Sequence, residues 1–204
     1  CAQDNMQVAN CTTPANYFHI LRRQMRRNFR KPLILMTPKS LLRHKRAVST
    51  LKEMGPGSSF HRVLWDDAET RPGSTVSLVG DDKIRRVILC SGKVYYDLLE
   101  EREKRGIDDV YLLRVEQFYP YPAQSLITEL KRFTRADMVW CQEEPKNMGA
   151  WFFMDPNLEW TLGQVGAKTK LARYIWRPAA ASPATGLMSR HKQELEDFLN
   201  EAFA

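Results

Sequence analysis

The chain has 204 residues, 43% of them hydrophobic, and a formal net charge of +7. This length suffices for one sizeable hydrophobic core, or for one core with an appended segment. No run of about 18 uncharged apolar residues occurs, which excludes a membrane-spanning helix. The charge is uneven, because residues 1–52 hold eleven Lys and Arg but one acid, Asp4. Such a basic block can bind nucleic acid, an acidic partner domain or a phosphorylated ligand.

The first quarter is predicted to hold one helix and one strand. Its first residues have neither an initiator Met nor the basic and apolar regions of a signal peptide, so we expect a fragment of a longer polypeptide. Thr13 and Pro14 are typical of a helix start, and this helix is predicted to cover residues 14–30. Residues 33–36 are continuously apolar and are predicted to be a buried strand. The apolar residues expected to pack the helix into the core are Tyr17, Phe18, Leu21, Met25 and Phe29.

The middle of the chain is predicted to be a linker, followed by a regular α/β pattern. Residues 54–83 are rich in Gly, Pro, Ser and Asp, including the run Arg71-Pro72-Gly73-Ser74, with one short strand expected near residues 62–64. After Asp82, strand-like runs alternate with helical patterns, which predicts a mainly parallel sheet covered by helices on both faces. The predicted strands are 86–90, 110–115, 138–141 and 171–176, and the predicted helices are 93–104, 123–133, 149–160 and a terminal helix capped by Ser189.

The stretch from residue 138 to 151 points to a functional edge of this sheet. An apolar strand stops at Glu143 and Glu144, and Pro145 and Gly149 then precede an aromatic segment. In α/β proteins, the loops that follow strands at this edge form binding surfaces. Two carboxylates can act as general acid and base, but adjacent side chains on an extended chain point in opposite directions. We therefore expect these glutamates to cap the next helix or to pair with Lys or Arg.

A second loop of interest is Ser91-Gly92-Lys93, which follows the predicted strand at 86–90. A phosphate-binding loop of the Gly-x-x-x-x-Gly-Lys-Ser/Thr type is excluded, because Val87 and Val94 stand where that loop needs Gly and a hydroxyl residue. We expect a tight turn into a helix. The free N–H groups at that helix start could still hold an anion, with Lys93 beside them.

Neither a metal site nor a catalytic residue is predicted from the cysteines and histidines. The cysteines form no Cys-x-x-Cys pair and are expected to be buried, reduced thiols, which argues against a zinc site. No histidine lies near a Ser or Cys in a nucleophile elbow, and His19 is expected to pack or to hydrogen-bond. The residues considered are Cys1, Cys11, Cys90 and Cys141, and His19, His44, His61 and His191.

A series of motifs in fixed order covers residues 5–204. They occupy residues 12–19, 21–23, 30–33, 37–44, 90–98, 114–117, 140–145, 149–151, 177–178 and 181–186, with Asn147. Together these motifs closely resemble the C-terminal end of one family, the thiamin-diphosphate-dependent decarboxylating component of 2-oxoglutarate dehydrogenase complexes. Several of the motifs have six or more residues, which makes the resemblance specific.

The resemblance implies a domain division and a role in an oxidoreductase. Residues 1–50 look like the tail of a pyrimidine-binding domain, residues 51–84 like a linker, and residues 85–204 like a transketolase-type C-terminal domain, a three-layer α/β/α sandwich. The whole enzyme of this family is a homodimer that binds thiamin diphosphate and magnesium. It decarboxylates 2-oxoglutarate and passes the succinyl group to a lipoyl arm of the succinyltransferase core.

The family's catalytic and metal-binding motifs lie upstream of the matching region. We therefore expect a structural and assembly portion that is itself inert and binds no cofactor. Its expected partners are the rest of the polypeptide, the dimer partner and the lipoyl core, with no nucleic acid and no membrane. The expected location is the bacterial cytoplasm, or the mitochondrial matrix in a eukaryote. The alternatives left open are activity on 2-oxoadipate and a free-standing α/β module that binds a ligand or nucleic acid.

Some members of the family carry an allosteric site for a CoA ester in this region. Arg23 and Gln117 match residues of that site, and with Lys93 they are the candidate allosteric or anion-binding residues of this chain. At four other positions this chain lacks the hydroxyl and cationic groups that those members have. Without these groups, the phosphates of a CoA ester lose binding partners, so we do not expect the site to operate. The departing residues are Gln7, Ser59, Gln124 and Ser125.

Overall fold

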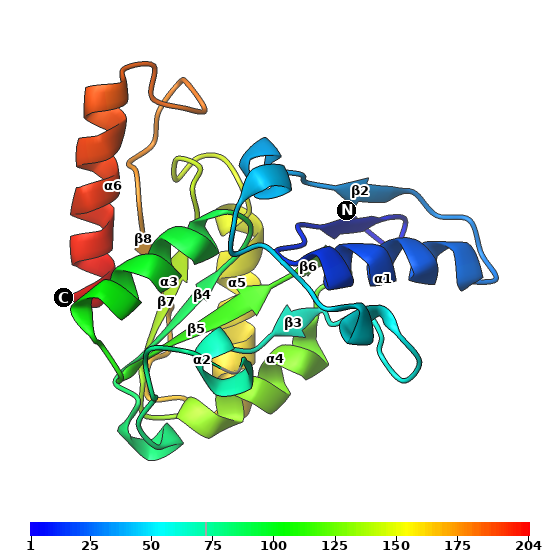
Figure 1. Cartoon of the computed structure of the whole chain (residues 1–204), viewed down its shortest axis with the longest axis horizontal. Helices are drawn as coiled ribbons and strands as arrows, with labels where there is room; N and C mark the ends of the chain where they lie inside the picture. Colours follow the sequence, from blue (N-terminus) through cyan, green and yellow to red (C-terminus); the bar gives the residue numbers. More distant parts are fainter. Residues whose placement is uncertain (72) are drawn as a thin grey trace.

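The computed structural model describes residues 1–71 and 73–204, so Pro72 of the predicted linker lies outside the described residues. The chain folds around two β-sheets, which can be followed in Figure 1. The larger sheet has five strands in the order β3-β5-β4-β7-β8, and the smaller has three in the order β2-β1-β6. Within the described ranges, no helix is both long enough and apolar enough to cross a membrane.

The larger sheet is mainly parallel. Its central strand β4 pairs in parallel with β5 on one side and β7 on the other, and β8 continues the sheet in parallel beyond β7. Only β3, at the far edge, pairs antiparallel. All six residues of β5 are buried, as expected for a parallel sheet that is covered on both faces. The strands are β3 (Val63–Leu64), β4 (Arg86–Cys90), β5 (Val110–Val115), β7 (Asp137–Cys141) and β8 (Arg173–Ile175).

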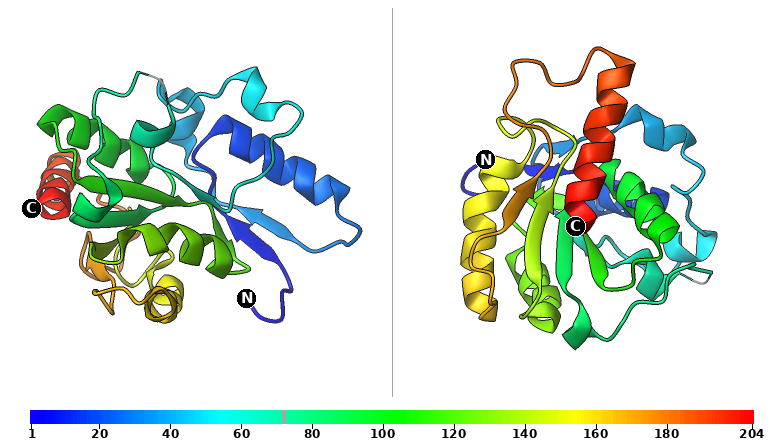
Figure 2. Two further views of the ribbon diagram at one scale, coloured as in Figure 1. Left: turned by 90° about the horizontal axis from the view of Figure 1, so that it is seen from below. Right: turned by 90° about the vertical axis from the view of Figure 1, so that its left-hand side faces the viewer.

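Two pairs of helices cover opposite faces of this sheet, which makes a three-layer α/β/α sandwich (Figure 2). Alternate residues of β4 face opposite layers. Leu89 belongs to the core shared with α4 and α5, whereas Cys90 belongs to the core shared with α3 and α6. The predicted α/β fold class is therefore confirmed. The helices are α3 (Val94–Arg105), α4 (Ala123–Leu130), α5 (Trp151–Val165) and α6 (Met188–Phe203).

The smaller sheet joins the first quarter of the chain to the larger domain. Its middle strand β1 pairs in parallel with β2 and antiparallel with β6, and β6 directly follows β5 of the larger sheet. Helix α1 packs on this sheet through Ile20, which shares a small core with Ala9 and Cys11. The strands β1 and β6 were not predicted. The elements are β1 (Gln7–Ala9), α1 (Pro14–Arg26), β2 (Leu33–Leu35) and β6 (Gln117–Tyr119).

The predicted core face of the first helix is wrong. The side chains of Phe18, Leu21 and Met25 are 41%, 44% and 79% exposed, and Phe29 lies beyond the helix end at Arg26. Polar side chains on the opposite face hydrogen-bond to main-chain carbonyl groups of the predicted linker, so the linker segment covers that face instead. The buried residues of α1 are Ala15, Asn16, His19 and Ile20.

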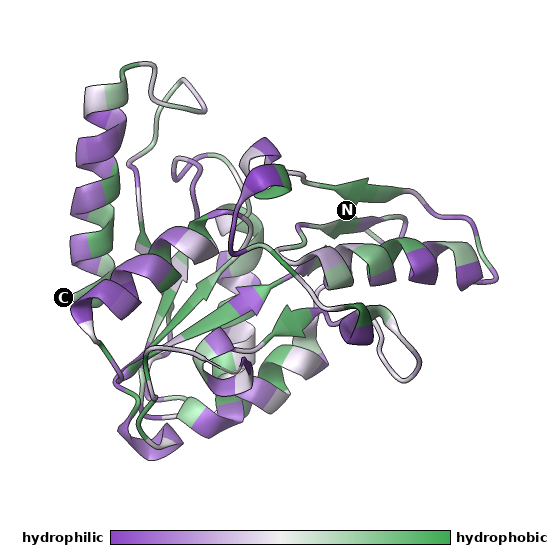
Figure 3. Cartoon of the chain, in the orientation of Figure 1, coloured by the Kyte–Doolittle hydropathy of each residue, from purple (hydrophilic) through white to green (hydrophobic). Residues whose placement is uncertain are grey.

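The predicted strand at residues 33–36 exists as β2, but the prediction that it is buried is wrong. It lies at the edge of the smaller sheet, and the side chains of Ile34 and Met36 are 42% and 46% exposed. Figure 3 shows this edge strand in the green of hydrophobic residues. A run of apolar residues predicts burial only where another element covers both of its faces.

Three elements near the C-terminus differ from their predicted bounds. Helix α5 was predicted at 149–160 but continues through Pro156 to Val165, and Gly166 then ends it with a φ of 66°. Helix α6 begins at Met188, so Ser189 lies inside the helix and is not its cap. Strand β8 is shorter than the predicted 171–176. Short helical turns complete the chain as η1 (Lys39–Arg43), η2 (Leu51–Met54), α2 (Asp67–Thr70), η3 (Asp81–Lys83) and η4 (Lys131–Phe133).

A fully buried ion pair anchors the segment that precedes β4. Asp66 and Arg102 are both 0% exposed, and both Nη atoms of Arg102 donate to the Asp66 carboxylate. The same carboxylate accepts the main-chain N–H groups of Ala68 at 2.8 Å, which caps α2, and of Leu112 at 2.7 Å. A buried charge is tolerated only when it is paired and hydrogen-bonded in this way.

Removing Arg102 leaves the buried Asp66 carboxylate without its cation. We expect Arg102→Ala to lower the free energy of unfolding by about 3–5 kcal/mol. Arg105→Ala on the same helix is the matched control, because Arg105 pairs with Glu101 near the surface and such pairs contribute at most about 1 kcal/mol. Urea unfolding followed by circular dichroism measures both losses. Equal losses in the two variants would contradict a special role for the buried pair.

Candidate functional site

The carboxyl ends of β4 and β7 form the edge where this fold places a binding site. The two strands end side by side, with Cys90 opposite Cys141. From β4 the chain passes to β5 on one side, whereas from β7 it passes to β8 on the other. The order of strands therefore reverses between β4 and β7, and the loops that follow them diverge. Such a reversal point is the usual place of a ligand crevice in open α/β sheets.

The side chain of Gln142 organises the loop after β7. Its Oε1 atom accepts hydrogen bonds from Trp140 Nε1 at 3.1 Å and from the main-chain N–H groups of Ala150 and Trp151 at 3.1 and 2.9 Å. Its Nε2 atom donates to the Met148 carbonyl at 2.7 Å. Gln142 thus satisfies free N–H groups at the start of α5, which is the role that we had predicted for the neighbouring glutamates.

Two glycines leave room for amide side chains at this edge. Gly149 has a φ of 67°, and a Cβ atom there would lie 2.9 Å from Gln142 Nε2. Gly92 has a φ of 71°, and a Cβ atom there would lie 2.5 Å from Asn10 Nδ2. Asn10 follows β1, so a side chain of the first quarter presses against the loop after β4. Both close approaches require glycine, for the backbone conformation as well as for space.

The adjacent glutamates do not converge on one point. Glu143 lies 3.3 Å from Lys93 Nζ, which also contacts Asp97 at 3.1 Å, so the predicted pairing with a basic residue is confirmed for Glu143. Glu144 is exposed, and partial desolvation together with the charge of Glu143 raises its pKa. Partial burial lowers the pKa of Lys93, but Asp97 and Glu143 outweigh this effect and the net shift is upward. Lys93 is thus already neutralised by two carboxylates.

A crevice of about 580 Å³ opens beside these loops. We call it the switch-point crevice. Aromatic side chains form much of its wall, and polar side chains from the ends of β1, β4 and β7 reach it. The residues that line it are Cys1, Val8, Asn10, Met36, Ser91, Phe118, Tyr119, Trp140, Gln142, Glu144, Gly149, Ala150 and Phe153.

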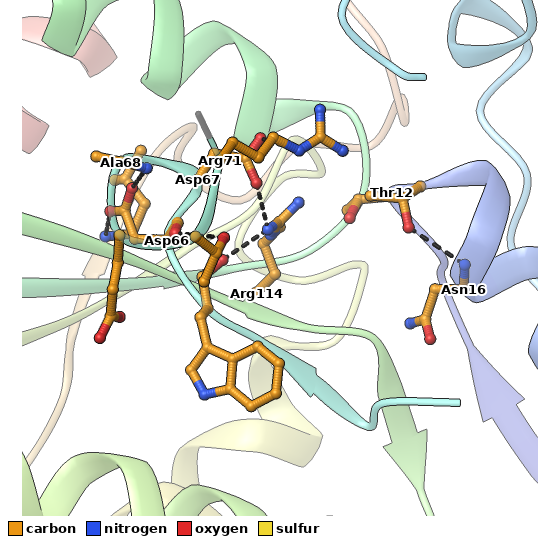
Figure 4. A network of polar contacts seen from close by, with 12 residues as sticks. Thr12, Asn16, Asp66, Asp67, Ala68, Arg71 and Arg114 are labelled. Atoms are coloured by element: carbon orange, nitrogen blue, oxygen red, sulfur yellow. Dashed lines mark hydrogen bonds and ion pairs between the residues drawn. The ribbon is translucent and has the colours of Figure 1, made fainter. Parts of the chain in front are cut away.

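A buried polar cluster connects the first quarter to the larger sheet (Figure 4). The Glu116 carboxylate accepts hydrogen bonds from the N–H and hydroxyl groups of Thr12, at 2.9 and 2.6 Å, and from Asn16 Nδ2 at 2.9 Å. Nearby, Arg114 Nη2 donates to Asp67 at 2.7 Å, and Figure 4 shows Arg114 between Asp67 and the start of α1. Complete burial raises the pKa of Glu116, although Arg114 and the three hydrogen bonds oppose that rise.

The structure brings together two of the three candidate allosteric residues. Arg23 Nη2 donates to Gln117 Oε1 at 2.7 Å and to Gln7 Oε1 at 2.9 Å, and the guanidinium lies 4.2 Å above the ring of Phe60. Burial, together with the nearby charges of Arg27 and Arg62, lowers the pKa of Arg23 to about 10. Lys93 lies apart from this pair, beside Asp97 and Glu143. Gln124 and Ser125 line a separate shallow pocket together with Phe60, and Ser59 is exposed.

The histidines and cysteines have mainly structural surroundings. His19 is 3% exposed and its Nε2 atom donates to the Glu53 carbonyl at 2.8 Å, as predicted for a hydrogen-bonding residue. Three cysteines are buried as predicted, but the prediction is wrong for Cys1, which is exposed. Burial raises the thiol pKa of Cys11, Cys90 and Cys141. No group of three or more His, Cys, Asp or Glu that could hold a metal ion occurs in residues 1–71 and 73–204.

Comparison with known proteins identifies relatives for almost the whole chain. A family model described as 2-oxoglutarate dehydrogenase C-terminal matches residues 48–203, and one described as transketolase, pyrimidine binding domain matches residues 2–45. Proteins named 2-oxoglutarate dehydrogenase E1 component from Brucella anthropi, Brucella ovis and Brucella abortus are each 72% identical to this chain over 202 residues. That match covers 99% of this chain but 20% of each relative, so the chain spans about a fifth of their length.

The contact between Gly92 and Asn10 can be tested by adding one methyl group. Gly92→Ala and Gly106→Ala both place a side chain at positive φ, which costs about 1–2 kcal/mol in each case. Only at Gly92 does the new Cβ atom meet a neighbour, because nothing lies within 4 Å at Gly106. We expect Gly92→Ala to be less stable than Gly106→Ala by about 1–3 kcal/mol in chemical unfolding. Equal stability of the two variants would show that Asn10 does not press on this loop.

Proposed function

Because the chain belongs to the 2-oxoglutarate dehydrogenase C-terminal family, we propose that it is the structural and assembly portion of a 2-oxoglutarate dehydrogenase E1 component. The curated relatives with that name are about five times longer than this chain. The activity of the whole enzyme is therefore part of what we propose. The whole enzyme would decarboxylate 2-oxoglutarate with thiamin diphosphate and transfer the succinyl group to a lipoyl arm. This chain would position the domains that carry out that chemistry.

Thiamin diphosphate and magnesium would be held mainly by other parts of the whole enzyme. A metal that bridges the diphosphate requires several oxygen ligands, and the described part of the chain holds no cluster of three or more acidic, His or Cys residues. The adjacent glutamates at the sheet edge diverge, and Glu143 is bound to Lys93. We therefore assign no catalytic step to these residues.

The observation that carries the proposal is the open edge of the smaller sheet. Among the strands of residues 1–71 and 73–204, β2 pairs on one side only, with β1. Leu33 and Leu35 pack toward α1, whereas Ile34 and Met36 on the other face are exposed. An unpaired apolar edge strand is a liability unless another element covers it. The match of residues 2–45 to a pyrimidine-binding domain supports the view that further strands of such a domain cover this edge.

The junction between the segments suits a role in assembly. Thr12 and Asn16 bind Glu116, and Tyr96 donates to the Thr12 carbonyl at 2.7 Å, so α3 and the end of β5 both hold the start of α1. The two family models, which match residues 2–45 and 48–203, support the proposed division into a pyrimidine-domain tail at 1–50, a linker at 51–84 and a C-terminal domain at 85–204. The tail and the C-terminal domain would then move as one body. The homodimer, the lipoyl succinyltransferase core as a partner and a cytoplasmic location are proposed from the family resemblance.

A chimaera tests the proposal. The 202 matching residues of the Brucella anthropi protein are replaced by this chain, and 2-oxoglutarate-dependent reduction of an artificial electron acceptor is measured. We expect the chimaera to be active and the isolated chain to show no turnover. In the chimaera, Ile34→Asp with Met36→Asp should lower activity at least about tenfold, because buried charges at an apolar contact disrupt it. Leu171→Asp is the matched control, since Leu171 is 60% exposed in the other domain.

Three outcomes would refute this role. They are turnover by the isolated chain, a folded chimaera without activity, and equal effects of the two sets of aspartate substitutions. Circular dichroism of each variant shows whether a loss of activity reflects unfolding.

A further inference from the structure

Residues 177–187 lie between β8 and α6 and contact the loop that follows β7. We call them the strap, which is the orange segment that leads to α6 in Figure 1. None of its residues is buried. Asn147 of the loop binds the strap, because its Oδ1 atom accepts the Ala180 N–H group and its Nδ2 atom donates to the Ala180 carbonyl, each at 3.0 Å. The strap can therefore move while the hydrophobic cores stay closed.

Trp176, directly before the strap, has an unfavourable backbone conformation. Its φ is 137°, which a bulky L-residue rarely adopts. Its ring packs edge-on against Phe198 of α6, with the ring centroids 4.0 Å apart. Such a conformation persists only where neighbouring contacts enforce it, and it is found at ligand clamps and switch regions. The strain at Trp176 therefore favours any movement of the strap that lets φ become negative.

Contacts on both sides of Trp176 hold it in this conformation. Before it, Ile175 pairs with β7 in the larger sheet. After it, the Arg177 carbonyl accepts hydrogen bonds from the Lys146 N–H group at 3.1 Å and from Tyr174 Oη at 3.2 Å. The first contact belongs to the sheet, whereas the bond from Lys146 ties the strap to the loop after β7. Loss of that bond would let the backbone at Trp176 relax.

Ion pairs tie the strap to the first turns of α6. The Arg177 Nε atom lies 3.2 Å from the Glu194 carboxylate, and both side chains are at most 20% exposed. The same carboxylate accepts hydrogen bonds from Thr185 Oγ1 and, at 3.0 Å, from Arg190 Nε. The strap and these first turns therefore form one unit, which Trp176 joins to the sheet.

We propose that the strap is a two-state latch at the carboxyl edge of the larger sheet, with Trp176 as its strained hinge. In the closed state, which the structure shows, Asn147 and Lys146 hold the strap on the loop after β7. In the open state these bonds break, Trp176 takes a negative φ, and the two donors are free at the edge where this fold places ligands. The strain narrows the free-energy difference between the states, so the chain opens transiently on its own. This device goes beyond the assembly role and does not depend on it.

Hydrogen exchange of the whole 15N-labelled chain, followed by nuclear magnetic resonance, measures the opening. In the unsubstituted chain, the Ala180 N–H group should exchange at least about 100-fold faster than that of Ile88 in the central strand, because the strap opens without the core. Trp176→Gly and Trp176→Ala both remove the indole ring, but only glycine adopts positive φ freely. The Ala180 N–H group should therefore exchange about three- to tenfold more slowly in Trp176→Gly than in Trp176→Ala. Ser182→Gly and Ser182→Ala are the matched control pair, since Ser182 is exposed in the strap and has no positive φ.

A substitution at Asn147 tests whether the bonds of the latch open together. Asn147→Ala removes both bonds to Ala180 and should speed exchange of the Lys146 N–H group about three- to tenfold, although the Asn147 side chain does not bind that group. Asn157→Ala is the matched control, because the Asn157 amide donates to the Phe153 carbonyl within α5, at 2.7 Å. It should leave exchange at Lys146 unchanged. The spectrum of each variant shows whether the chain is folded.

Four results would overturn the latch. They are exchange of the strap at the rate of the central strand, equal exchange in the two Trp176 variants, slower exchange in Ser182→Gly than in Ser182→Ala, and no effect of Asn147→Ala at Lys146. The comparison of the strap with the central strand needs no substitution, so it decides the question even if a variant is unstable. None of these results bears on the chimaera, whose outcome concerns assembly.

Discussion

Buried carboxylates are the constraint on which this fold depends. Asp66 and Glu116 are both 0% exposed, and each must find cations or N–H and O–H donors inside the protein. Arg102 and two main-chain N–H groups satisfy Asp66, whereas Thr12 and Asn16 satisfy Glu116. The donors belong to α1 and the residues before it, to α2, to α3 and to β5, whereas Asp66 directly precedes α2 and Glu116 directly follows β5. Satisfying the two acids therefore ties the first quarter, the segment before β4 and the larger sheet into one body.

The sequence predicted the elements whose signals are local. The strands at 86–90 and 110–115 are confirmed residue for residue, because continuous apolar runs suit a sheet that is buried on both faces. The strands β1 and β6 have three residues each and show no usable periodicity. The face of α1 was misassigned for a different reason. Asn16 and His19 are buried against carbonyl groups that lie 34 or more positions further along the chain. The hydrophobic pattern of the helix itself gives no information about these distant partners.

The same difference between local and distant signals applies to the candidate site. The motif at residues 140–151 correctly directed attention to the carboxyl edge of the sheet, but its two glutamates drew the interpretation away from Gln142. Gln142 was predictable in part, since an amide between a buried strand and Gly149 can cap a following helix. The contact of Asn10 with Gly92 was not predictable, because more than 80 residues separate the two positions and they meet only in the folded chain, where β1 pairs with β6.

The burial of three thiols means that their labelling can be used to follow the unfolding of the chain. Cys90 and Cys141 lie opposite each other at the carboxyl ends of the neighbouring strands β4 and β7, Cys11 lies under α1, and burial raises the pKa of each thiol. Only thiolates react readily with alkylating reagents. In the folded chain Cys1 alone is therefore open to rapid labelling. During unfolding, the rate at which Cys11 becomes labelled would measure the release of α1. The rate of labelling at Cys90 and Cys141 would measure the separation of β4 from β7.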